Sequence, residues 1–212
     1  MSLTKQEFSE LMNSDAIKHN GSMIRHLFQK PFDIMPNDFL SFAEIDFGEG
    51  QTDRHIVNAL SNVKRAFHCQ IDILLFNSGI NKIAQKNKWD FIKKMSFLEQ
   101  MGLLNPTIIK KINLKRNILE HRYKTPEIED VADALDIISI FIGYCEQYKI
   151  PNSIGITIHD NERYILNLDR EKCIIEVHRD EDFHNTGNDT PLFLVTYEDD
   201  IYLDIINFFW KQ

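Results

Sequence analysis

The strongest constraint on the fold is a change of hydrophobic period at Pro151. Between residues 52 and 148, apolar side chains recur every three or four positions, as they do on one face of a helix. Between residues 154 and 197, apolar and polar side chains alternate, as they do in half-buried strands. The sequence therefore predicts an α+β protein in which an N-terminal α-helical bundle is followed by a small antiparallel β-sheet domain.

The helical part contains four segments with clear start or stop signals. Thr52 is a suitable N-cap and Gly79 a suitable stop for a long helix between them, and Gly102 ends a second helix. Asn105-Pro106 and Thr125-Pro126 are each typical of a helix start. The expected helices span 52–78, 89–101, 106–120 and 126–148. Because each carries an apolar stripe that needs a partner, we expect one bundle over residues 51–150.

The C-terminal part, residues 151–212, consists of short alternating segments separated by polar turns. We expect a four-stranded antiparallel meander followed by a helix that covers it. The expected strands span 154–158, 163–168, 173–178 and 191–197, and the expected helix spans 201–210.

Residues 1–50 show a weaker pattern. Helices are expected over 4–11 and 16–29, the second interrupted near Asn20-Gly21. The chain from Pro31 to Gly50 is expected to be irregular, because it combines two prolines with an acidic, glycine-containing stretch.

Composition excludes several classes of protein. The chain has 212 residues, of which 43 % are hydrophobic, so a core is readily formed. No apolar run approaches the roughly 18 residues that cross a bilayer, and the first residues lack the layout of a signal peptide. Cys69, Cys145 and Cys173 lie far apart, which argues against a disulfide framework or a zinc knuckle. We therefore expect a cytoplasmic protein with no membrane partner, no metal and, without a glycine-rich phosphate loop, no cofactor.

The charge is distributed unevenly along the chain. The net charge is −8, yet residues 81–125 contain 11 basic and 3 acidic side chains, and residues 126–212 contain 6 basic and 19 acidic ones. Local Lys and Arg density, and not the average over the chain, attracts phosphate backbones. The basic segment therefore indicates an RNA-binding surface, although a solvated lysine-rich helix face has the same composition.

One stretch of the basic segment, Arg116-Asn117-Ile118-Leu119-Glu120-His121-Arg122-Tyr123, combines the groups that metal-free RNA cleavage needs. An arginine binds phosphate with a permanent charge, and a histidine transfers protons near neutral pH. Attack by the 2′-hydroxyl of RNA requires a base, an acid and charge stabilisation. Chance alone supplies about 0.3 Arg–His pairs of this spacing per chain of this composition, so the spacing is weak evidence without its context.

The context resembles a known family. The pattern Arg116-Asn117-x-x-x-His121, placed just before the helix expected at 126–148, is similar to the R-x(4–6)-H signature of the HEPN (higher eukaryotes and prokaryotes nucleotide-binding) domains. The resemblance covers residues 52–148 and implies an HEPN-like bundle. It also implies an endoribonuclease whose active site forms between two copies of the chain.

The resemblance assigns roles to individual residues. Arg116 would stabilise the scissile phosphate, His121 would act as general acid or base, and Asn117 would orient one of these residues or the phosphate. Tyr123 would contact RNA or stack on a base. The basic neighbours would hold the RNA backbone; these are Lys110, Lys111, Lys115, Arg122 and Lys124. Because Tyr123 also matches the R-x4-H-x-Y variant of HEPN toxins, a protein antitoxin or regulator is a further expected partner, with a role in antiviral defence. The alternative is a non-catalytic HEPN interaction or RNA-binding module in a defence or stress-response system.

Three further features of the sequence bear on chemistry or assembly. Trp89, Phe91 and Met95 are strongly apolar for a lysine-rich segment, which predicts that they form the face of a homodimer. His68-Cys69 lies within a long apolar helix and is expected to pack in the core or at the dimer face. His178 and His184 bracket an acidic loop that offers metal ligands, but a polar surface loop explains the same residues.

Overall fold

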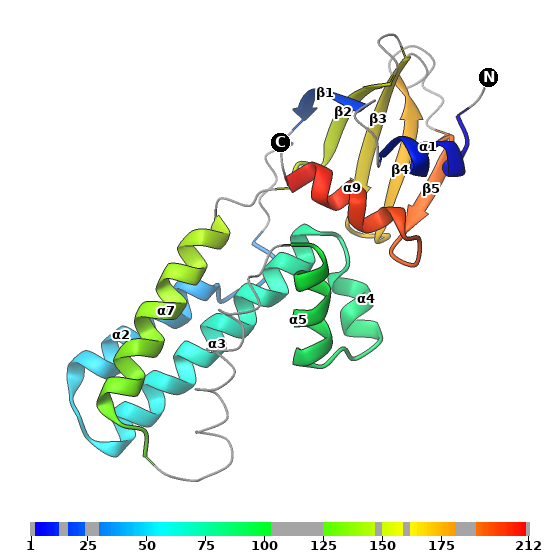
Figure 1. Cartoon of the computed structure of the whole chain (residues 1–212). Helices are drawn as coiled ribbons and strands as arrows, with labels where there is room; N and C mark the ends of the chain where they lie inside the picture. Colours follow the sequence, from blue (N-terminus) through cyan, green and yellow to red (C-terminus); the bar gives the residue numbers. More distant parts are fainter. Residues whose placement is uncertain are drawn as a thin grey trace. The chain divides into compact units, whose positions relative to one another are not determined.

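The computed structural model describes residues 3–12, 17–23, 30–102, 125–146, 150–158, 162–180 and 190–210 (Figure 1). The chain divides into two compact units. The sheet unit comprises Met1–Phe28, Leu75–Lys88 and Lys149–Gln212, and the helical unit comprises Gln29–Leu74 and Trp89–Tyr148. The α+β class expected from the sequence is confirmed. The sequence suggested the consecutive ranges 1–50, 51–150 and 151–212 as domains. The two units do not follow these ranges, because Met1–Phe28 and Leu75–Lys88, both far from Pro151 in the sequence, belong to the sheet unit.

The sheet unit is built on a five-stranded antiparallel sheet in the order β1-β2-β3-β4-β5. The strands are β1 Ile17–Met23, β2 Ser153–Ile158, β3 Glu162–Asp169, β4 Ile174–Arg179 and β5 Phe193–Thr196. The meander and the helix expected after Pro151 are therefore confirmed. Helices α1 (Lys5–Met12) and α9 (Ile201–Trp210) cover the same face of the sheet (Figure 1). The Phe8 ring of α1 lies 5.6 Å from the Phe193 ring of β5 in this core.

The first strand corrects the sequence analysis. Residues 17–23, expected within a helix, form β1 and pair with β2 from Ile17 opposite Ile158 to Met23 opposite Ser153. The register shifts between His19 and Ser22, so the Asn20-Gly21 pair that was read as a helix interruption lies at an irregularity of the strand. Pairing with β1 satisfies backbone groups along the edge of β2 that the meander alone would leave open.

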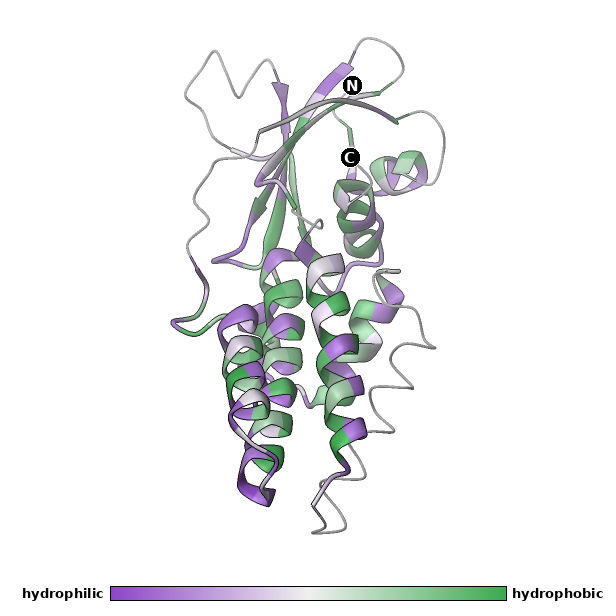
Figure 2. Cartoon of the chain, turned by 90° about the vertical axis from the view of Figure 1, so that its left-hand side faces the viewer, coloured by the Kyte–Doolittle hydropathy of each residue, from purple (hydrophilic) through white to green (hydrophobic). Residues whose placement is uncertain are grey.

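The helical unit contains α2 (Pro36–Glu49), most of α3 (Asp53–Asn77), α5 (Phe91–Gln100) and α7 (Ile128–Glu146). The helices expected at 52–78, 89–101 and 126–148 are confirmed to within two residues at each end, whereas 106–120 lies outside the described residues. The Phe67 ring of α3 lies 5.6 Å from the ring of Phe91 on α5 and 5.3 Å from that of Phe141 on α7. Figure 2 shows apolar and polar residues alternating around the helices, as packing on one face requires.

Helix α2 is a second correction, because this stretch was expected to be irregular. Pro36 occupies the first turn, where its missing N–H and its fixed φ are tolerated. The carboxylate of Asp38 accepts a hydrogen bond of 2.8 Å from the backbone N–H of Met35. Leu40 and Ala43 are buried on one side of the helix. The proline that suggested a loop instead begins a helix.

The chain after α3 is fixed tightly within the sheet unit. Gly79 has φ +78°, and the next N–H, of Ile80, donates to the Leu75 carbonyl at 3.0 Å, as in a Schellman motif. The expected helix stop at Gly79 is therefore confirmed, and the short helix α4 (Asn81–Lys86), which the sequence analysis did not predict, follows it. The Tyr202 hydroxyl of α9 donates to the Ser78 carbonyl at 2.6 Å.

A partly buried arginine completes this attachment. Arg170, at the end of β3, donates from Nη1 to Asn152 Oδ1 at 2.6 Å, from Nη2 to the Ile150 carbonyl at 2.8 Å and from Nε to the Asn77 carbonyl at 3.2 Å. Burial lowers the pKa of the guanidinium to about 10, so it remains charged at neutral pH. Its hydrogen bonds join the end of α3, the start of β2 and the β3–β4 turn.

Candidate functional site

The motif residues predicted from the sequence all lie outside the described residues. This holds for the catalytic candidates Arg116, Asn117 and His121, and for the RNA-binding candidates Lys110, Lys111, Lys115, Arg122, Tyr123 and Lys124. The described chain fixes only their neighbours. Helix α5 ends at Gln100, and Gly102 follows with φ +69°. Helix α7 begins at Ile128, after the buried Pro126. The motif therefore lies between two helices of the helical unit in the sequence.

Several lysines of the basic segment that the structure describes have partners within the chain. Lys94 Nζ lies 2.6 Å from Asp72 Oδ1, and both side chains are partly buried. Lys82 pairs with Glu171, and the Lys93 ammonium lies 4.7 Å from the centre of the Trp89 ring. The carboxylates of Asp72 and Glu171 therefore offset part of the positive charge of this segment, and with it part of its attraction for RNA.

The apolar residues expected at a dimer face lie elsewhere. Trp89 and Met95 are buried within the chain, with exposures of 9 % and 4 %, and Phe91 packs on Phe67. The exposed apolar side chain of α5 is Ile92, at 73 %. The expectation that Trp89, Phe91 and Met95 form an interface is therefore wrong, because these side chains pack within their own chain, Phe91 against α3.

A hollow in the helical unit brings together side chains that the sequence analysis did not connect. It has a volume of about 270 Å³ and is lined by His68, Ile71, Phe91 and Lys94. The His68 and Phe91 rings are stacked, with centroids 4.8 Å apart and planes at 19°. His68 and Ile71 share one face of α3 at a spacing of three, and Phe91 and Lys94 share one face of α5 at the same spacing. Only the packing of α5 on α3 joins the two pairs, so spacing in the sequence could not reveal the hollow.

The cysteine next to this hollow is not activated. Burial, together with the charges of Asp72 and Asp38, raises the pKa of Cys69 to about 11. Its thiol donates to the Ile34 carbonyl at 3.6 Å. Burial also raises the pKa of Cys145 to about 12. The reactive form of cysteine is the thiolate, so neither residue is suited to nucleophilic catalysis at neutral pH. Of the two places expected for Cys69, the core or a dimer face, the structure shows a half-buried thiol that bonds within its own chain.

These pKa values predict slow alkylation in the folded protein. At pH 8, raising a thiol pKa from about 9 to about 11 lowers the thiolate fraction about 100-fold. We expect iodoacetamide to modify Cys69 and Cys145 at least that much more slowly in native protein than in 6 M guanidinium, as measured by mass spectrometry of tryptic peptides. The Cys69 rate should rise tenfold per pH unit up to about pH 11. Equal native and denatured rates at pH 8 would contradict the burial of these thiols.

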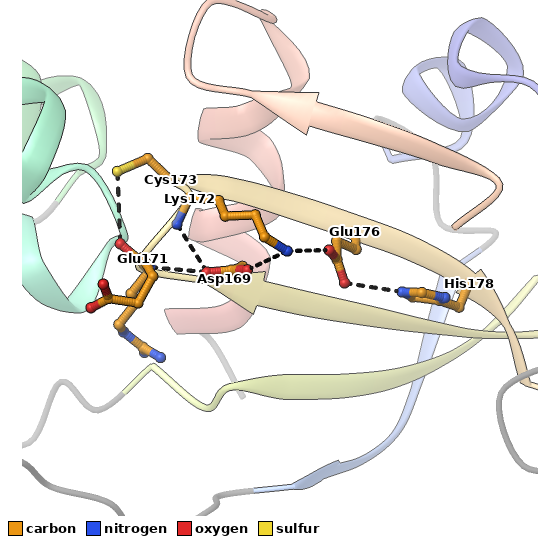
Figure 3. Close-up of polar contacts among 7 residues, drawn as sticks. Asp169, Glu171, Lys172, Cys173, Glu176 and His178 are labelled. Atoms are coloured by element: carbon orange, nitrogen blue, oxygen red, sulfur yellow. Dashed lines mark hydrogen bonds and ion pairs between the residues drawn. The ribbon is translucent and has the colours of Figure 1, made fainter. Parts of the chain in front are cut away.

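His178, the described member of the predicted histidine pair, belongs to a network on the β3–β4 hairpin (Figure 3). It is buried on β4, and its Nε2 lies 3.3 Å from Glu176 Oε2. Lys172 Nζ lies 3.5 Å from Glu176 Oε1 and 3.0 Å from Asp169 Oδ2. Burial raises the pKa of Asp169, but hydrogen bonds from the backbone and side chain of Lys172 outweigh this and leave it below its ordinary value. The network stabilises the turn between two strands, and His184 lies outside the described residues.

Comparisons with family models, with curated proteins and with solved structures give no match to this chain. Within the described ranges, no helix combines the length and apolar character needed to cross a membrane.

Proposed function

We propose that this protein is a metal-independent endoribonuclease of the HEPN type that acts as a homodimer with a composite active site. The observation that carries the proposal is the sequence Arg116-Asn117-x-x-x-His121-x-Tyr123 in the most basic part of the chain. Two further observations support it. The motif lies between α5 and α7 in the sequence of a helical unit, and the helix that follows it, α7, has 19 residues and matches the long final helix that the resemblance implies.

The proposed reaction is attack of a 2′-hydroxyl on the adjacent phosphate. A base removes the proton of the 2′-hydroxyl, and an acid protonates the departing 5′-oxygen. His121 supplies these functions, while the guanidinium of Arg116 stabilises the negative charge that develops on the phosphate oxygens. Asn117 orients the phosphate or His121, and Tyr123 contacts the RNA. The lysines and Arg122 around the motif bind the backbone.

The proposal of a composite site follows from the need of the reaction for both an acid and a base. Each chain supplies one His121, whereas the acid and the base act at the same time on opposite sides of the phosphate. A two-fold axis that pairs the motifs of two copies provides both groups and doubles the local positive charge. A protein antitoxin or another regulator would act most directly by covering this paired surface.

A second function, a non-catalytic RNA-binding or interaction module, is favoured by one observation. Lys94 and Lys82 are paired with carboxylates of the same chain, so part of the basic segment is already neutralised. Such a module would bind RNA or a partner protein without cleaving RNA.

A cleavage assay separates these functions. Purified protein is incubated with labelled RNA in EDTA, and we expect cleavage that leaves 2′,3′-cyclic phosphate ends. A substrate with a 2′-deoxy sugar at the scissile position should remain intact, because it lacks the nucleophile. Cleavage that appears only with added Mg²⁺ or Mn²⁺ would refute the mechanism, and RNA binding without cleavage would support the module.

A further inference from the structure

We infer that the hollow lined by His68, Ile71, Phe91 and Lys94 binds a nucleobase. The inference rests on the proposed function for the class of its ligand, because RNA brings bases to the helical unit that contains the motif. The hollow itself is built from described residues alone: two from α3 and two from α5. The hollow would therefore bind the base, whereas Arg116 and His121 are proposed to act on the phosphate.

The walls of the hollow suit a flat aromatic ring. The His68 and Phe91 rings stack on each other, with centroids 4.8 Å apart and planes at 19°, so a base stacks on an outer face of this pair. The side chain of Ile71 adds an aliphatic surface. Phe91 is held in place from behind by Phe67, whose ring lies 5.6 Å away. Single-stranded RNA is commonly bound by stacking its bases on such aromatic side chains. A rigid aromatic wall needs little ordering when the base arrives.

The polar part of the hollow selects a neutral ligand over a phosphate. The charge of Lys94 is offset by Asp72, with Nζ and Oδ1 only 2.6 Å apart, so the pair carries no net charge. An ammonium group has three N–H donors and a carboxylate has two acceptor oxygens, so a pair of this kind can donate and accept at the same time. Every nucleobase has donor and acceptor groups side by side on its Watson–Crick edge, whereas a phosphate only accepts.

The size of the hollow limits the ligand. Its volume of about 270 Å³ is just below the roughly 300–1,000 Å³ of typical small-molecule sites. One base with its sugar directed outward fits this volume. An extended ligand does not. The side chain of Lys94 retains 22 % exposure, so the polar end of the hollow is open to solvent.

The test uses the Ile71 methyl group as a reporter of the hollow. The full-length protein is labelled at its isoleucine δ1-methyl carbons and titrated separately with uridine 5′-monophosphate, adenosine 5′-monophosphate, an octamer of uridylate, and ribose 5-phosphate. We expect the Ile71 resonance to shift with the ligands that carry a base and not with ribose 5-phosphate. The exposed Ile92 and Ile140 serve as controls. A shift with the monophosphates but not with the octamer would identify the ligand as a free nucleotide; a shift with both would place RNA in the hollow.

Matched variants test the polar contact. Lys94→Met removes the donor but keeps the length of the stem, and we expect binding to weaken about tenfold, as for the loss of one hydrogen bond to a charged group. Lys93→Met, the adjacent lysine with the same charge change, should bind as the parent does. If Lys94→Met loses its folded spectrum, Phe91→Leu, which removes the ring at a similar volume, should weaken binding likewise.

The result is separable from the test of cleavage. His121→Ala protein should keep the Ile71 shift even if it cleaves nothing, because the described lining of the hollow is unchanged in this variant. An unchanged Ile71 resonance at millimolar nucleotide, or an equal shift with ribose 5-phosphate, overturns the inference and leaves the proposed nuclease function unaffected.

Discussion

Replacing His121 by alanine is expected to lower RNA cleavage at least about 100-fold, the usual contribution of a general acid or base. Arg116→Ala should cause a loss of similar size, because one group that stabilises the transition-state charge is typically worth about 10²–10³ in rate. Single-turnover cleavage in EDTA measures both variants. His178→Ala is a matched control, because it removes a histidine of the sheet unit that belongs to a structural network. Full activity of His121→Ala would refute the proposed role of this residue.

The composite active site adds a sharper expectation. When His121→Ala and Arg116→Ala chains are unfolded together and refolded, part of the dimers contain one chain of each kind. Such a dimer keeps one histidine and one arginine in the paired site, whereas each variant alone lacks both copies of one of these groups. It should therefore cleave RNA faster than either variant, although more slowly than the parent with its two histidines. Sedimentation must show dimers in all three samples for the comparison to count. A mixture no more active than its parents, in protein that is dimeric, would indicate that each chain carries a complete site or none.

The parts of the fold that the sequence predicted are those set by local chemistry. The apolar stripe between Thr52 and Gly79 determines α3, and the alternation after Pro151 determines the meander. The errors have a different origin. Whether residues 17–23 form a strand depends on the open edge of β2, which lies more than 130 positions away in the sequence. Pro36 permits either a loop or a helix start, and the Asp38–Met35 hydrogen bond stabilises the helix.

The candidate site residues also include some that the sequence alone reveals and some that only the packing reveals. The Arg116–His121 motif is contiguous, so the sequence alone can propose it. The hollow depends on the contact of Phe91 with Phe67 and His68, and the same contact accounts for the wrong prediction of a dimer face. An apolar residue among lysines has the same sequence signature whether it packs within the chain or between chains. Only the rotation of α5 about its axis distinguishes the two cases.

Gly79→Ala is expected to cause a large loss of stability. An L-residue at φ +78° is strained by about 1–2 kcal/mol. An added Cβ would also lie 2.7 Å from Leu168 Cδ1 and 3.1 Å from the Tyr202 hydroxyl. Displacing Tyr202 weakens its buried hydrogen bond to Ser78, and crowding a packed core costs a further 1–3 kcal/mol or so. We expect a total loss of about 2–5 kcal/mol, which lowers the melting temperature by roughly 10 °C.

Substitutions at Gly102 and Gly143 separate the backbone strain from the steric crowding that this prediction combines. Gly102 has a similar φ, +69°, but an added Cβ meets nothing within 4 Å, so Gly102→Ala should show the strain alone, about 1 kcal/mol. Gly143 lies within α7 with open space around it, and Gly143→Ala should stabilise that helix by about 0.5–1 kcal/mol. Calorimetry of the three variants tests the order. If Gly79→Ala and Gly102→Ala cost the same, the turn after α3 is not packed against Leu168 and Tyr202, and the close attachment of this turn within the sheet unit is wrong.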